Sequence, residues 1–186
     1  MKARIAVLLL VVCCAADAQT VTPSITIGTH VLTLGMPETT VLEQLGTDLE
    51  LYPIQHPGNG VTSGWIVSKK TGALKGELMG SVYFDASHHL WDAMRSWDVE
   101  DTSSKTLFYA INEATKSVES DGLTACHIST HDKSQTWTGP FGTGSIDSKE
   151  IMIDCGIKKI TIDLTLSDVP RMVPTSISVE EELRGK

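Results

Sequence analysis

Basic side chains are scarce in this chain, and they do not cluster. The 186 residues include 15 Lys and Arg but 23 Asp and Glu, so the formal net charge is −8 at pH 7. An acidic chain without a basic patch is repelled by phosphate backbones and by anionic lipid headgroups. The composition therefore argues against a nucleic-acid partner and against binding to a membrane surface.

Signatures of catalysis and of cofactor binding are also missing. The sequence has no G-x-S-x-G nucleophile elbow and no C-x-x-C redox motif, and the glycine-rich stretch 139–144 lacks the lysine of a phosphate loop. His127 and His131 would lie roughly 13 Å apart on a strand, so they cannot share one zinc ion. We predict no catalytic residue, no metal site and no cofactor. A small secreted hydrolase, whose site is assembled from scattered Ser, His and Asp residues, is the alternative.

The N-terminus has the pattern of a cleavable export signal. A basic start precedes an apolar run over residues 5–15, and an A-x-A cleavage site ends at Ala18. The run is too short to cross a bilayer, which takes roughly 20 residues. We expect residues 1–18 to be a signal peptide and residues 19–186 to be exported, periplasmic or secreted, without membrane insertion after cleavage.

Four cysteines are present, and signal cleavage would remove Cys13 and Cys14. Lipidation of one of these two is an alternative, although neither follows the small residue that lipidation signals have. The remaining pair, Cys126 and Cys155, falls in strand-like segments of an exported chain, where an even pair is typically bridged. We expect a structural disulfide that closes a loop of about 30 residues and stabilises the fold by roughly 3 to 4 kcal/mol.

The first half of the chain begins with a strand pattern and a short helix pattern. Apolar residues alternate over 25–34, which predicts a half-buried strand. Pro37 suits the start of a helix of about nine residues that ends at Gly46. The stretch 49–64 is rich in Pro and Gly and predicts mostly loop. An antiparallel meander is then indicated by strand patterns at 65–68, 78–84 and 90–97.

The second half opens with the clearest helix pattern of the sequence. Over 102–118 apolar residues recur at i, i+4, i+7 and i+11, and Gly122 follows as a terminator. The strand pattern at 158–166 is also clear, because Ile and Leu alternate strictly with Thr and Asp. In chain order, the predicted strands of this half are 123–131, 149–155, 158–166 and 175–183.

This order of elements predicts an α+β fold. Helices that pack on one face of an antiparallel sheet make this class. We predict a single domain over 19–186 with two helices packed on an antiparallel meander sheet. The halves 25–98 and 101–184 both read helix then strands, and they are candidates for a diverged tandem helix-plus-sheet repeat.

Three short motifs of the first half resemble a known group of exported proteins. Residues 34–36 read Leu-Gly-Met, residues 45–46 read Leu-Gly, and residues 84–85 read Phe-Asp. Over residues 30–98 the chain resembles the small envelope proteins related to β-lactamase inhibitor protein and to the small outer-membrane-assembly lipoprotein. Pro37 departs from the Ser or Thr that usually caps this helix. The resemblance implies an exported binding module of helix-plus-sheet type.

Aromatic residues make up only 5% of the chain, so their positions are informative. The segment 132–148 predicts a long loop that carries Trp137 and Phe141, and such loops are often functional. Both rings suit a partner interface or a lid folded back on the sheet. Trp91 and Trp97 lie six apart on one predicted strand and share its face, as a second candidate patch or as core packing. We therefore expect a non-enzymatic exported module that acts through protein contacts in the cell envelope.

Overall fold

The computed structural model describes six stretches of the chain, which are residues 22–58, 60–70, 77–99, 104–139, 142–169 and 175–185. Within them, the side chains of residues 97–99 and 104–106 are not described. The expected signal peptide, residues 1–18, lies outside these stretches, and so does Phe141.

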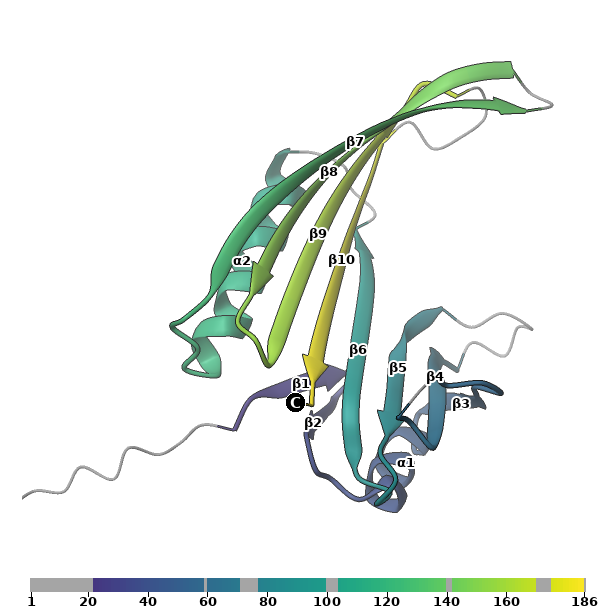
Figure 1. Cartoon of the computed structure of the whole chain (residues 1–186), viewed down its shortest axis with the longest axis vertical. Helices are drawn as coiled ribbons and strands as arrows, with labels where there is room; N and C mark the ends of the chain where they lie inside the picture. The colour runs from purple at the N-terminus through teal and green to yellow at the C-terminus, as the bar shows by residue number, and fades with distance from the viewer. Residues whose placement is uncertain are drawn as a thin grey trace, which may run out of the picture.

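The described residues form two helices and ten strands (Figure 1). In chain order these are β1 (Ser24–Ile27), β2 (His30–Thr33), α1 (Glu38–Gly46), β3 (Leu49–Pro53), β4 (Ser63–Lys69), β5 (Leu78–Phe84), β6 (Leu90–Val99), α2 (Ser104–Ser120), β7 (His127–Gly139), β8 (Gly142–Asp154), β9 (Lys158–Ser167) and β10 (Thr175–Arg184). A helix followed by four strands therefore occurs twice.

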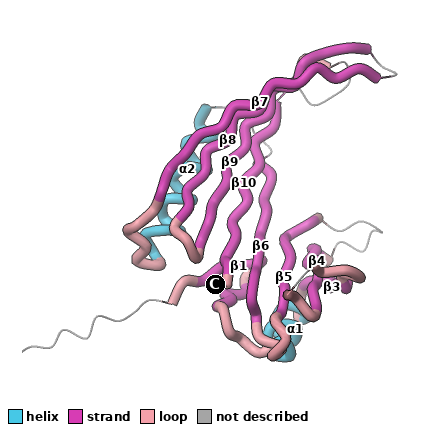
Figure 2. The backbone as a smooth tube through the Cα atoms, in the orientation of Figure 1, coloured by secondary structure: helices cyan, strands magenta, loops and turns pink. Residues whose placement is uncertain are grey.

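One antiparallel sheet carries eight of these strands, in the order β3-β4-β5-β6-β10-β9-β8-β7. Each half contributes a four-stranded meander, and the halves meet where β6 pairs with β10 (Figure 2). The strand order is thus symmetric about this central pair. The α+β class, with two helices on an antiparallel meander sheet, is confirmed.

Both helices cover the same face of the sheet. Directly opposite residues of paired antiparallel strands share a face, and Val67 of β4 lies in the same row as Ile160 of β9. Val67 packs in the apolar cluster with α1, and Ile160 packs in the cluster with α2. We call this side the covered face and the other side the open face. The covered-face row that joins all eight strands is Leu51, Val67, Gly80, Arg95, Glu181, Ile160, Ile153 and Ile128.

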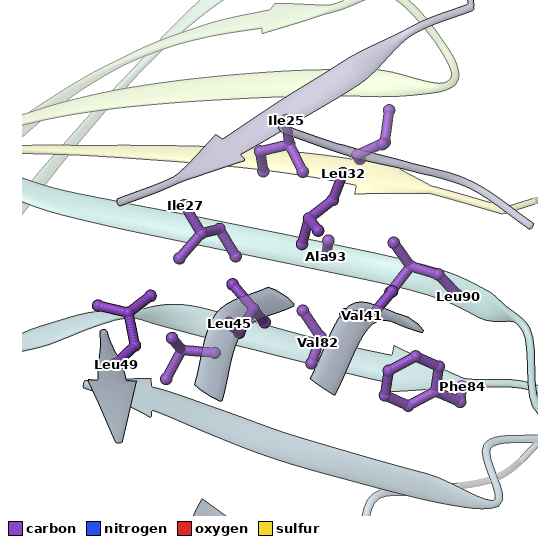
Figure 3. Close-up of a cluster of buried hydrophobic side chains, with 12 residues drawn as sticks. Ile25, Ile27, Leu32, Val41, Leu45, Leu49, Val82, Phe84, Leu90 and Ala93 are labelled. Atoms are coloured by element: carbon purple, nitrogen blue, oxygen red, sulfur yellow. The ribbon is translucent and has the colours of Figure 1, made fainter. Parts of the chain in front are cut away.

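Two clusters of buried side chains hold the helices against the sheet. In the first, Val41 and Leu45 of α1 lie against Val82, with side chains of the β1–β2 hairpin beside them (Figure 3). In the second, Ala110 and Ala114 of α2 pack on Ile and Val side chains of β9 and β10. Each fully buried large aliphatic side chain contributes roughly 1.5 to 3 kcal/mol relative to exposure. Helix α1 has only nine residues and depends on this packing.

The segment 132–148 is not the long loop that its composition predicts. Strands β7 and β8 pair along their whole length, from His127 opposite Asp154 to Gly139 opposite Gly142. The pairing of β8 with β9 ends at Ile146, so the hairpin extends beyond the rest of the sheet as an arm (Figure 1). Most of β7 is exposed, and a strand without a buried face shows no apolar alternation.

Two shorter predictions also differ from the structure. The expected strand 25–34 is a hairpin of β1 and β2, because Gly28 has φ 63° and turns the chain. The expected loop 49–64 contains the edge strand β3, in which Pro53 is the last residue and faces no neighbour on its outer side. Proline is tolerated at such an edge because no ladder hydrogen bond is lost there.

Candidate binding face

No described helix or strand packs on the open face of the sheet, where the loop that carries Pro57 and Val61 reaches the central strands. Its central row runs through Tyr52, Ile66, Ser81, Met94, Glu182, Lys159, Asp154 and His127. Tyr52 is 48% exposed and Ile66 is 39% exposed. Large apolar side chains that lie together on an uncovered surface often mark an interaction site.

Carboxylates outnumber basic side chains on this face. By strand register its described acidic residues are Glu50, Asp92, Glu150, Asp154, Asp163, Glu180 and Glu182, whereas its described Lys and Arg residues are Lys133, Lys159 and Arg184. This local excess has the same sign as the net charge of the chain. The face therefore attracts positively charged groups and repels anions.

A hollow of about 330 Å³ lies on the open face beside the central strands. Its lining consists of Pro57, Val61, Tyr83, Trp91, Asp92, Met94 and Glu182. A register shift in the β5–β6 pair, between Tyr83 opposite Asp92 and Phe84 opposite Leu90, leaves Trp91 as an extra, unpaired residue. Such a bulge changes the direction in which its side chain points. It accounts for the place of Trp91 in the hollow next to its neighbour Asp92.

Two glycines leave the space that the aromatic rings of the hollow occupy. A Cβ atom on Gly64 would lie 2.8 Å from Cδ1 of Tyr83, and one on Gly185 would lie 2.5 Å from Cε3 of Trp91. Both distances are shorter than a van der Waals contact, so each ring lies directly over glycine backbone. The Gly185 N–H also donates a hydrogen bond of 2.6 Å to the Trp91 carbonyl oxygen. The rings are therefore placed by the fold before any partner arrives.

Asp92 is the chemically unusual group of the hollow. Its pKa is raised to about 6, mainly by partial burial and also by the nearby Glu182 carboxylate, whereas Arg184 acts in the opposite direction. The Arg184 guanidinium instead pairs with Glu182, with Nε 2.9 Å from Oε2. No donor of the described residues forms a hydrogen bond with the Asp92 carboxylate. Asp92 is thus a partly desolvated carboxylate, and the cation directly opposite it on β10, Arg184, forms its ion pair with Glu182.

The four aromatic residues singled out from the sequence do not form one site. Trp91 lines the hollow and is 37% exposed. The backbone of Trp97 pairs with Val179, but its side chain lies outside the described part. Trp137 is half-buried in the hairpin arm, where its ring occupies the space that a side chain on Gly139 would need.

Sequence reasoning missed Tyr83 and Asp92 as members of a site. Neither belongs to a motif, and the bulge that brings Trp91 beside them depends on pairing between β5 and β6. A bulge leaves no local sequence pattern of its own here, so no signal in the sequence points to the hollow.

The expected disulfide between Cys126 and Cys155 is present. The two Cα atoms are 4.1 Å apart, next to the terminal β7–β8 pair of His127 and Asp154. Both cysteines pack against the apolar cluster under α2. The bond therefore closes the open end of the hairpin at the side opposite its protruding tip.

One cluster brings together a hydroxyl, a carboxylate and an imidazole, as a hydrolase site would. The Ser63 hydroxyl donates to Glu38 Oε1 at 2.6 Å, and His88 Nδ1 lies 2.6 Å from Glu38 Oε2. Burial raises the pKa of Glu38, but hydrogen bonds from Ser63, His88 and Trp65 outweigh this and lower it overall. Because the carboxylate lies between the other two groups, the imidazole does not accept the hydroxyl proton, as a serine nucleophile requires. The cluster instead ties the start of α1 to β4 and to the turn before β6.

Metal ligands and membrane-spanning helices can be considered within the described part of the chain. No three His, Cys, Asp or Glu side chains there are grouped so that they could hold a metal ion. None of the helices in this part of the chain is long and apolar enough to span a membrane.

A scan against protein-family models gives no match, and a search of curated proteins gives none.

Proposed function

We propose that this chain is an exported, non-enzymatic binding module that acts through protein contacts in the cell envelope, with the open face as its contact surface. One observation carries the proposal: both helices and the β1–β2 hairpin pack on one face of an eight-stranded sheet, and no described helix or strand packs on the other. Trp91, Tyr52 and Ile66 are exposed on that face. A sheet with one solvated face is normally polar there, so these side chains suggest a partner.

The size of the open face suits a protein partner. Eight strands about 4.8 Å apart span roughly 34 Å, and six residues along each strand add about 20 Å. The resulting area of roughly 700 Å² is close to the approximately 800 Å² that each protein contributes to an interface of standard size. A small ligand would use only a fraction of this surface.

Two features support a place outside the cytoplasm. The Cys126–Cys155 disulfide fits an oxidising compartment, where such bonds form and persist. The basic start, apolar run and A-x-A site within residues 1–18 are the sequence pattern of an export signal. The periplasm and the extracellular space both meet these conditions.

The proposal is tested by crosslinking and capture from the envelope and secreted fractions of the source organism. The parent chain is compared with an open-face variant, Tyr52→Ala with Ile66→Glu, and with an arm variant, Trp137→Ala with Phe141→Ala. Tyr109→Ala is the matched control, because Tyr109 is a 58% exposed aromatic residue on α2, away from the open face.

We expect one partner to be captured by the parent and by the control, and to be lost with the open-face variant. Loss of capture with the arm variant alone would instead place the contact surface on the β7–β8 hairpin. Absence of any partner, or equal loss with the control, would refute the proposal. Each variant is first checked for folding by circular dichroism.

A further inference from the structure

We propose that the hollow formed by Tyr83, Trp91 and Asp92 on the open face receives an Arg or Lys side chain of the partner protein. This inference rests on the proposed function and specifies the chemistry of the contact. The hollow would act as the specificity pocket of the open face, with the rest of the face supplying area.

The two rings and the carboxylate offer complementary contacts to one organic cation. The faces of Trp and Tyr rings attract guanidinium and ammonium groups through the negative charge density of the π-system. A carboxylate accepts charge-assisted hydrogen bonds from the same groups, in bidentate form from arginine. Tyr83, Trp91 and Asp92 line the same hollow, so one side chain can use both kinds of contact.

Asp92 forms no ion pair within the described residues, and Arg184 lies directly opposite it in the β6–β10 register. Arg184 pairs with Glu182 on the same strand, and Lys159 on the neighbouring strand β9 lies outside the lining of the hollow. An incoming cation therefore does not have to break an ion pair of Asp92, and it would share this carboxylate with the Arg184 charge. It would supply the missing donor and lower the pKa that partial burial has raised.

Other occupants fit the hollow less well. An apolar side chain would bury Asp92 further without giving it a donor, which is costly for a carboxylate. An anionic group would face Asp92, Glu182 and the wider acidic surface. The hollow of about 330 Å³ is at the lower end of the range of ligand pockets, about 300 to 1,000 Å³, and suits one side chain.

Preorganisation strengthens the inference. The rings already lie over Gly64 and Gly185, so binding does not have to order them first. A pocket that is formed in advance loses less conformational entropy on binding.

The test uses blocked Gly-Arg-Gly and Gly-Lys-Gly peptides as probes, with Gly-citrulline-Gly as the uncharged counterpart of arginine. Binding to the purified chain is followed by NMR, through the indole N–H signal of Trp91 and the backbone amides of β6 and β10. Asp92→Asn and Trp91→Leu remove the two kinds of contact, and Trp91→Phe restores a ring. Glu180→Gln is the matched control, since Glu180 is an exposed carboxylate on the same face outside the hollow.

We expect saturable shifts with the Arg and Lys peptides, and an affinity at least fivefold lower with Asp92→Asn and with Trp91→Leu. Trp91→Phe should recover part of the affinity, and Glu180→Gln should change it by less than about twofold, as expected for a screened surface charge. Equal binding of the citrulline peptide, no binding of any peptide, or an unchanged affinity with Asp92→Asn would overturn the inference.

The pH dependence provides a second readout. The described charged or titratable groups around Asp92 are Glu182 and Arg184 on β10 and Tyr83 on β5. With its pKa at about 6, Asp92 changes from mostly neutral at pH 5 to mostly ionised at pH 7. Affinity for the Arg peptide should rise several-fold over this interval in the parent and stay flat in Asp92→Asn. A flat profile in the parent would contradict the inference.

These outcomes are separate from those that test the proposed function. If the partner is captured through the open face but Arg and Lys peptides do not bind, the binding module stands and the cation pocket fails. If the peptides bind but no partner is captured, the pocket stands as a cation site and the contact with a partner protein fails. Partner capture by Asp92→Asn, compared with Glu180→Gln, shows whether a basic side chain of that partner occupies the hollow.

Discussion

The ammonium nitrogen of Lys158 lies 2.8 Å from Oε1 of Glu181, and both side chains are almost completely buried on the covered face. Lys158 also lies 2.5 Å from Asp121 Oδ2, at the end of α2. The other oxygen of Glu181 accepts a hydrogen bond from Arg95 on β6, and Arg95 in turn reaches the backbone of β1. Burial raises the pKa of Glu181, but Arg95 and Lys158 outweigh this and lower it overall. Two cations and two anions thus join α2, β1 and both central strands.

The first prediction concerns Lys158→Met, which removes one cation from this buried network. Asp121 would keep only its contacts with Ser24, and Glu181 would keep Arg95 and Ser117. Breaking a buried ion pair by removing one partner typically costs about 3 to 5 kcal/mol. We expect a loss of this size in the free energy of unfolding, measured by urea denaturation.

The matched control is Lys159→Met on the opposite face of the same strand. Lys159 is only half-buried and lies on the open face, so its replacement should change the unfolding free energy by less than about 1 kcal/mol. Equal effects of the two substitutions would contradict the assignment of Lys158 as the centre of the network.

The second prediction concerns replacement of both Cys126 and Cys155 by Ala. The bond spans a sequence separation of 29 residues, and closing a loop of this size stabilises a fold by about 3 to 4 kcal/mol in the chain-entropy estimate. We expect urea unfolding to show a loss of this order. A reducing agent should destabilise the parent by a similar amount and leave the double variant unchanged. An effect of the reductant on the double variant would point to a different cause.

The third prediction uses two glycines that respond in opposite directions to alanine. In Gly64→Ala the new methyl group would meet the ring of Tyr83, whereas at Gly46 the nearest atom is 3.9 Å away, on Leu51. Overpacking at Gly64 should cost about 1 to 3 kcal/mol, and Gly46→Ala in α1 should stabilise by roughly 0.5 to 1 kcal/mol. Urea unfolding of both variants checks the signs. Stabilisation by Gly64→Ala would show that the ring does not rest on that glycine.

Elements with a strong local period could be predicted from the sequence. The helix expected over 102–118 is α2, Ser104–Ser120, and the strand expected over 158–166 is β9, Lys158–Ser167. In both, apolar residues fall on one buried side and polar residues on the other, so the pattern reports the fold directly. The disulfide could be predicted as well, because the even cysteine pair and the export pattern point the same way.

Features that depend on contacts between distant segments could not be predicted. Edge strand β7 is exposed on both faces for most of its length and shows no alternation. The bulge at Trp91 arises from the register between β5 and β6. The partners of Lys158 are Asp121, just after α2, and Glu181 of β10, which lie 37 and 23 residues away in the sequence. The sequence next to these residues contains no pattern that indicates these contacts.

The last prediction concerns the pH dependence of stability in Asp92→Asn. In the folded chain the pKa of Asp92 is about 6, above the ordinary value of 3.8, so folding disfavours the charged form. Well below pH 3.8 the carboxyl group is protonated in both states and folding carries no penalty. As the pH rises from 4 to 6 the penalty develops, and above pH 6 it is complete. The amide that replaces this carboxyl group in the variant has no such penalty at any pH. The parent and the variant share every other titrating group, so the difference between their stabilities reflects Asp92.

Asp92→Asn should therefore be more stable than the parent at pH 7.5, by roughly 1 to 2 kcal/mol once solvent screening of a partly exposed group is allowed for. At pH 4 the two proteins should have nearly equal free energies of unfolding. Urea denaturation at both pH values gives the difference, and Glu180→Gln, an exposed carboxylate on the same face, should show no comparable change with pH. If Asp92→Asn were equally stabilising at both pH values, folding would not raise the pKa of Asp92. If it were destabilising at pH 7.5, Asp92 would already have a cationic partner within the chain. Either result would remove the need for a cation from outside.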